Sequence, residues 1–164
     1  AFRRVHERHP AAHLVLVGDF RLQPEVPALV ERLGLSASVH FVGEVAHEDL
    51  SPYYRLADVY VHSSIYEGLG KVLIEAAACG LPVVSTRTAG AQEIVRDGET
   101  GLLCNVGDPA DMAEKIVALL DDPPRAEAMG AAGRAFVLEK FDHARNLDAV
   151  VRTWQRTAAL GGKA

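Results

Sequence analysis

The sequence predicts an α/β fold, a Rossmann-like parallel sheet with helices on both faces. Short apolar runs alternate along the chain with segments of helical periodicity, which is the pattern of βαβ units. The predicted strands consist mostly of apolar residues, as strands buried on both faces of a parallel sheet do. Gly and Pro stand between the elements, where turns need a positive or a fixed φ.

The predicted strands are short runs of apolar and β-branched residues, at positions 13–17, 39–42, 59–62, 82–85 and 102–104. Helices are expected at 1–9, 26–33, 48–56, 70–79, 91–96, 109–120, 124–141 and 144–159, mostly from the recurrence of apolar residues every three or four positions. Pro109 and Pro124 stand where helices begin, and Asp108 precedes the first of them as an N-cap. Right-handed crossovers favour a doubly wound sheet.

The 164 residues are enough for one domain with a single core. We expect this domain at residues 1–160, with a flexible tail at 161–164 after Gly161 and Gly162. The chain opens without Met, inside the second half of an amphipathic helix with Phe2 and Val5 on one face. We therefore expect that the natural start lies upstream and that the first strand of the domain is missing.

Composition excludes several classes of protein. The chain is 49% hydrophobic and 24% charged, and it has no apolar run near the roughly 20 residues that span a bilayer. Its net charge of −5 argues against a nucleic-acid surface, which needs clustered Lys and Arg. Cys79 and Cys104 form no C-x-x-C pair, which favours reduced thiols and a cytoplasmic location.

Three histidines, His6, His9 and His13, lie close together near the start of the chain. Pro10 interrupts the helix between them, and no cysteine or acidic cluster completes a ligand set. The sequence therefore predicts no metal site.

The most informative segment is 62–80, which leaves a strand, crosses a glycine-containing loop and enters an apolar helix. A helix that opens beyond the carboxyl end of a parallel strand points free N–H groups at a ligand. Gly68 and Gly70 allow close approach, so the amides of Gly70, Lys71 and Val72 could hold a diphosphate. Alone, this Gly-x-Gly fits a tight strand-to-helix turn equally well.

Two carboxylates flank this turn. Glu67 precedes it, and Glu75 lies inside the helix among mostly apolar neighbours. A carboxylate in such surroundings is costly unless it has hydrogen-bond partners, and two ribose hydroxyls would supply them. The alternatives are an exposed Lys71–Glu75 pair for Glu75 and a carboxylate favoured by the helix dipole for Glu67.

These residues resemble the E-x7-E region of family 4 of the retaining glycosyltransferases, which have the two-Rossmann-domain GT-B architecture. Other segments match the C-terminal domain of that family in the same order, at residues 14–18, 39–43, 56–59, 80–85, 93–95 and 97–103. The likeness runs from about residue 1 to residue 155. It identifies the chain as the C-terminal, donor-binding half of a GT-B glycosyltransferase, truncated at its N-terminal end.

The resemblance implies a role for each matching position. Glu67 is the catalytic candidate that contacts the transferring hexose, and Glu75 binds the ribose hydroxyls. The remaining donor contacts would be backbone amides to the sugar (Gly68, Leu69, Gly70), amides to the phosphates (Lys71, Val72) and a loop against the base (Gly43, Glu44, Val45).

Three further acidic residues match the pattern or lie beside it. Glu93 and Asp97 are expected to cap and orient the turn behind the site. Asp58, before a strand, is expected to be a structural hydrogen-bonding residue.

The implied reaction is transfer of a hexose from a nucleoside-diphosphate sugar to a sugar, lipid or glycan acceptor, with retention and without a cofactor or metal. The acceptor would be bound by an N-terminal domain absent from this chain. Polysaccharide biosynthesis and peripheral membrane association of the whole enzyme are further expectations. The alternatives are a non-catalytic nucleotide-sugar-binding subunit and a related GT-B enzyme, such as a nucleotide-sugar epimerase or a pyridoxal-phosphate-dependent phosphorylase.

The family also has an upstream strand whose loop carries an Arg and a Lys for the diphosphate. Without them, we expect the chain alone to bind nucleotide weakly and to have no transferase activity. The missing strand would lie between those expected at 13–17 and 59–62. The two inner edges should then close on each other or recruit a strand from another molecule.

Overall fold

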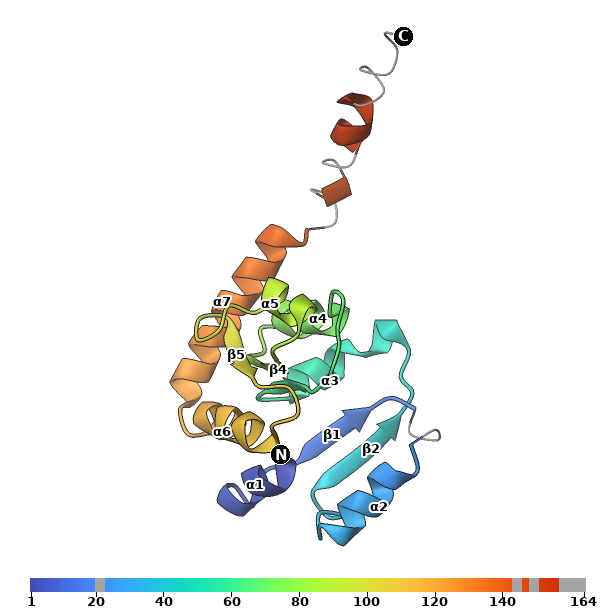
Figure 1. Cartoon of the computed structure of the whole chain (residues 1–164), viewed down its shortest axis with the longest axis vertical. Coiled ribbons are helices and arrows are strands. Elements are labelled where there is room, and N and C mark those ends of the chain that lie inside the picture. The colour runs from blue at the N-terminus through green and yellow to red at the C-terminus, as the bar shows by residue number, and fades with distance from the viewer. Residues whose placement is uncertain (20–22, 143–145, 148–150, 157–164) are drawn as a thin grey trace.

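A computed structural model describes residues 1–19, 23–142, 146–147 and 151–156. Strands and helices alternate along the described chain (Figure 1). In order they are α1 (Phe2–Arg8), β1 (Leu14–Val17), α2 (Glu25–Arg32), β2 (Val39–Gly43), the 3-10 helix η1 (His47–Asp49), α3 (Ser51–Leu56), β3 (Tyr60–His62), α4 (Lys71–Ala78), β4 (Val83–Thr86), α5 (Ala89–Ile94), β5 (Gly101–Cys104), α6 (Pro109–Leu120) and α7 (Pro123–Lys140).

Within the described residues the strands pair in parallel, as predicted, but they form two sheets. One sheet pairs β1 with β2, and the other has the order β3-β4-β5. Figure 1 shows the β1–β2 pair, with α2 beside it, lying apart from the other strands. Within the described residues β1 and β3 do not pair with each other, so the expected closure of these two edges is not seen.

Helices cover both faces of the three-stranded sheet, because successive residues of a strand point to opposite sides. Val84 and Leu102 face one core, which is built with α1 and α6 around Val5 and Leu119. The neighbouring residues of the same strands face a second core, which is built with α4, α5 and α7 and includes Val83, Leu103, Leu73, Ile94 and Val137. All of these side chains are at most 5% exposed. The predicted α/β class is confirmed.

Most predicted boundaries hold, and the exceptions have local causes. Asp108 caps α6, accepting hydrogen bonds from two backbone N–H groups at 3.0 Å. The helix expected at 48–56 divides into η1 and α3, since Pro52 has no N–H to donate to the carbonyl of Glu48. The helix expected at 144–159 is only partly described, and the tail at 161–164 lies outside the described residues. None of the described helices is long and apolar enough to cross a membrane.

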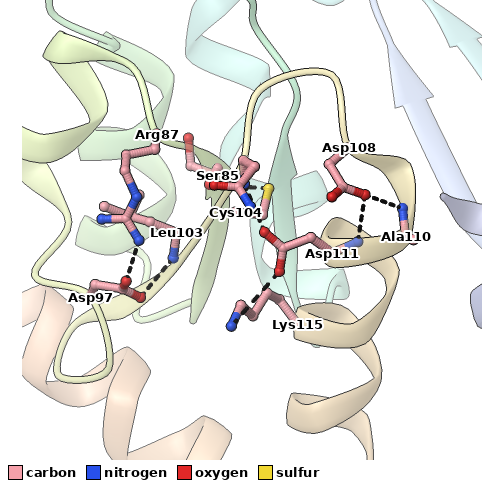
Figure 2. A network of polar contacts seen from close by, with 10 residues as sticks. Ser85, Arg87, Asp97, Leu103, Cys104, Asp108, Ala110, Asp111 and Lys115 are labelled. Carbon is pink, nitrogen blue, oxygen red and sulfur yellow. Dashed lines mark hydrogen bonds and ion pairs between the residues drawn. The ribbon is translucent and has the colours of Figure 1, made fainter.

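A polar network ties the end of β4 to β5 (Figure 2). Asp97 accepts a hydrogen bond from the Leu103 backbone N–H at 2.9 Å and pairs with the Arg87 guanidinium at 2.6 Å. Burial raises the pKa of Asp97, but these hydrogen bonds and the Arg87 charge outweigh it and hold that pKa below its usual value. Asp97 therefore has the structural role expected for it. The side chain of Glu93 is largely exposed and lies 4.0 Å from Lys140 of α7.

Replacing Asp97 by asparagine should lower the free energy of unfolding by about 1 kcal/mol at pH 7, because the charge is lost while an acceptor for Leu103 remains. A carboxyl whose folded pKa is depressed stabilises the protein above its unfolded pKa, and this stabilisation is lost as the pH falls through the folded pKa. The difference in free energy of unfolding between wild type and variant should therefore disappear below about pH 4. Urea unfolding at pH 7 and pH 3 measures this difference at each pH. An equal difference at the two pH values would contradict the charge-based explanation.

Candidate functional site

The loop between β3 and α4 carries the predicted donor-site residues. Helix α4 starts at Lys71, and Gly70 precedes it with a left-handed φ of 64°. A Cβ at Gly70 would stand 2.9 Å from the side chain of Leu73 and 3.2 Å from that of Glu67. The left-handed backbone angle therefore favours glycine at this turn, and a larger residue would also have to displace the side chain of Leu73. The first N–H groups of α4 lack partners within the helix, as at any helix start.

Glu67 is fixed at the entrance of this loop by the last residue of β3. Its Oε2 lies 3.3 Å from Nε2 of His62, and the side chains of the two residues are 28% and 13% exposed. His62 was not among the site residues predicted from the sequence. Its position at the carboxyl end of a strand, five residues before Glu67, is the signal that could have indicated it.

The same loop rests on the start of α5. The Gly90 N–H donates to the carbonyl of Glu67 at 3.0 Å, and Thr86 donates through its hydroxyl to the carbonyl of Ser64 at 2.6 Å. A Cβ at Gly90 would lie only 2.7–2.8 Å from carbonyl oxygens of Gly68 and Glu67. Gly90 therefore allows the loop to lie directly on α5. This residue, too, was not predicted as part of the site.

Glu75 lies on α4 with its side chain 28% exposed. Its Oε2 accepts a hydrogen bond of 3.0 Å from the Tyr54 hydroxyl, and its Oε1 lies 3.9 Å from Nδ1 of His47. The carboxylate therefore has the partner that its apolar surroundings require, and that partner is Tyr54 of α3, not Lys71.

The pKa values of two tyrosines near these carboxylates, Tyr54 and Tyr60, are raised. Burial, followed by the neighbouring Tyr60 and Glu75, raises the pKa of Tyr54 well above its usual value. Burial together with the charges of Glu75 and Glu67 raises the pKa of Tyr60 to about 12. Tyr60 thus senses the negative charge of both carboxylates, and both tyrosine hydroxyls stay protonated at neutral pH.

The base-side loop predicted at Gly43, Glu44 and Val45 follows β2. Gly43 ends that strand with a left-handed φ of 88°. An open hollow of about 630 Å³ lies at the carboxyl ends of the two-stranded sheet, lined by Gly18, Asp19, Pro27, Phe41, Val42, Gly43 and Glu44. Val45 is not among the lining residues. Gly18 and Asp19, which follow β1, were not predicted for the site.

In the part of the chain that the structure describes, no three His, Cys, Asp or Glu side chains are grouped to hold a metal ion.

Comparison with known proteins adds to this geometry. Residues 1–136 match the model of the family described as Glycosyl transferases group 1. This chain belongs to that family. A GDP-mannose-dependent alpha-(1-6)-phosphatidylinositol monomannoside mannosyltransferase of Mycolicibacterium smegmatis is 34% identical to it over 148 residues, which cover 86% of the chain and 39% of that protein.

Two solved structures are similar to this group 1 chain. The C-terminal domain of the group 1 protein LpcC from Francisella tularensis is 25% identical, with a TM-score of 0.77, over 87% of this chain and 78% of that domain. Anabaena HepE, in complex with UDP and glucose, is 28% identical with a TM-score of 0.82, over 93% of this chain but 44% of HepE. The resemblance to a C-terminal GT-B domain is confirmed, and the chain spans less than half the length of its full-length relatives.

Proposed function

We propose that this chain is the donor-binding part of a retaining glycosyltransferase, which transfers a hexose from a nucleoside-diphosphate sugar to a sugar, lipid or glycan acceptor. The observation that carries the proposal is the pair of held carboxylates, Glu67 and Glu75, on either side of the glycine turn at the start of α4. HepE, whose fold this chain shares, is in complex with UDP and glucose. The M. smegmatis relative is GDP-mannose-dependent. These two proteins therefore indicate different bases for the donor, uracil and guanine.

In this proposal the diphosphate meets the first amides of α4, at Lys71 and Val72, where the helix dipole favours negative charge. Glu75 accepts hydrogen bonds from the ribose. Glu67, with the amides of Gly68, Leu69 and Gly70, holds the hexose. The base lies against the loop at Gly43, Glu44 and Val45.

The proposed reaction is a front-face substitution that retains the anomeric configuration. The bond from the anomeric carbon to the phosphate oxygen breaks, the acceptor oxygen bonds to that carbon, and the acceptor proton passes to the leaving diphosphate. Glu67 then orients the sugar and is not a covalent nucleophile, because the second carboxylate, Glu75, is assigned to the ribose and is not placed as its acid/base partner. We further propose a cytoplasmic enzyme of polysaccharide biosynthesis that associates peripherally with membranes.

Donor binding should not require a divalent metal, since backbone amides take the place of the cation. Calorimetric titration of the 164-residue chain with UDP and with GDP, in EDTA and in millimolar Mg²⁺, tests this. We expect at least one nucleotide to bind with the same affinity in both buffers. Binding that EDTA abolishes would refute metal independence, and failure of both nucleotides to bind would refute donor binding by this chain.

A further inference from the structure

Glu75 needs more than a suitable position on α4 to bind a diol. A glutamate side chain rotates about three bonds, and freezing such a side chain has a large cost in conformational entropy. A group that already holds the carboxylate removes most of this cost from ligand binding. The structure supplies such a group in Tyr54.

Tyr54 is itself held by packing. Its ring lies 5.6 Å from the ring of Tyr60, at an interplanar angle of 56°, and packs against the core formed by α4, α5 and α7. Tyrosine has only two side-chain torsions, so a packed ring fixes the direction of its hydroxyl. Since Tyr54 and Glu75 are 21 residues apart, their hydrogen bond also links α3 to α4.

The hydrogen bond is directed at one carboxylate oxygen. Tyr54 donates to Oε2, and among the described residues Oε1 has an ion pair with Nδ1 of His47, at 3.9 Å. An ionised carboxylate has about four lone-pair sites, so three acceptor positions remain after Tyr54 has taken one. Two neighbouring hydroxyls need two of them. The raised pKa of Tyr54 keeps its hydroxyl a donor throughout the ordinary pH range.

We propose that Tyr54 is a positioning residue for ribose recognition: its hydroxyl holds Glu75 with Oε1 presented to the vicinal diol of the nucleotide, and so sets the preference for ribonucleotides over dideoxyribonucleotides. The inference rests on the proposed function, within which it adds a residue that does not itself touch the ligand.

The test compares affinities of the 164-residue chain for UDP and 2′,3′-dideoxy-UDP, and for the corresponding guanosine pair, by calorimetry at one pH. Wild type should favour the ribonucleotide about ten- to a hundred-fold, as expected for hydrogen bonds to a charged group. Tyr54→Phe should reduce this ratio about five-fold and leave dideoxynucleotide affinity unchanged. Tyr53→Phe, which removes a hydroxyl from the neighbouring residue of the same helix, should change neither value.

The Glu75→Gln variant separates this inference from the proposed function. If Glu75→Gln leaves the ratio at its wild-type value, Glu75 does not bind ribose and that part of the proposed function fails. If Glu75→Gln abolishes the ratio while Tyr54→Phe preserves it, only the positioning role fails. A Tyr54→Phe variant that weakens both nucleotides equally, or that only lowers the melting temperature, would show that Tyr54 is merely structural and would overturn the inference.

The double variant Tyr54→Phe/Glu75→Gln provides a second test of the positioning role. A residue that acts through Glu75 has no effect on the affinity ratio once Glu75 is changed. The double variant should have the ratio of Glu75→Gln alone. A further loss of ratio in the double variant would contradict the proposal.

Discussion

Replacing Gly130 by alanine is expected to destabilise the chain by about 3 kcal/mol or more. A Cβ at this position would clash with the carbonyl oxygen of Gly80 and would lie about 3 Å from other backbone atoms of the turn that joins α4 to β4. The gain in helix propensity from Gly to Ala is only about 1 kcal/mol. Helix α7 would have to move off α4, exposing the core between them.

Two other glycines calibrate this experiment. At Gly133 the nearest atom to an added Cβ is the Thr100 carbonyl oxygen at 3.0 Å, and at Gly68 nothing lies within 4 Å. Melting temperatures should therefore fall by roughly 10 °C for Gly130→Ala, less for Gly133→Ala and little for Gly68→Ala. A Gly130→Ala variant as stable as Gly68→Ala would show that α7 does not pack on that turn.

Removing the two site carboxylates should have different consequences. Glu75→Ala should weaken binding of a nucleoside diphosphate about ten- to a hundred-fold, because each lost charged hydrogen bond costs roughly 1.5–3 kcal/mol. Glu67→Ala should leave that affinity nearly unchanged, since its proposed contact is to the sugar, which the diphosphate lacks. In the full-length transferase, Glu67→Ala should reduce turnover by a similar factor.

Calorimetry with the nucleoside diphosphate and steady-state kinetics of the whole enzyme measure these effects. Glu139→Ala is the matched control, because Glu139 is an exposed residue of α7 and its removal changes the net charge equally. Equal losses of diphosphate affinity in Glu67→Ala and Glu75→Ala would mean that the two carboxylates do not have separate ligands.

The sequence by itself determined the fold class, the order of the elements and the position of the site along the chain. These features depend on residues close together in sequence. Apolar runs mark β4 and β5, Asp108 caps the helix that follows it, and Gly70 stands at the start of α4. Short-range periodicity and capping chemistry are sufficient to identify such elements.

Only the tertiary structure decided which side chains support the site. Tyr54 reaches Glu75 across 21 residues, and Gly90 lies beneath the loop of Glu67 because β4 places α5 beside it. The cost of burying Glu75 was foreseen, but the partners considered for it were ribose hydroxyls and Lys71, because helical periodicity does not show which side chain of another helix lies next to it. The division into two sheets was likewise decided in three dimensions, because strand pairing depends on contacts between distant segments.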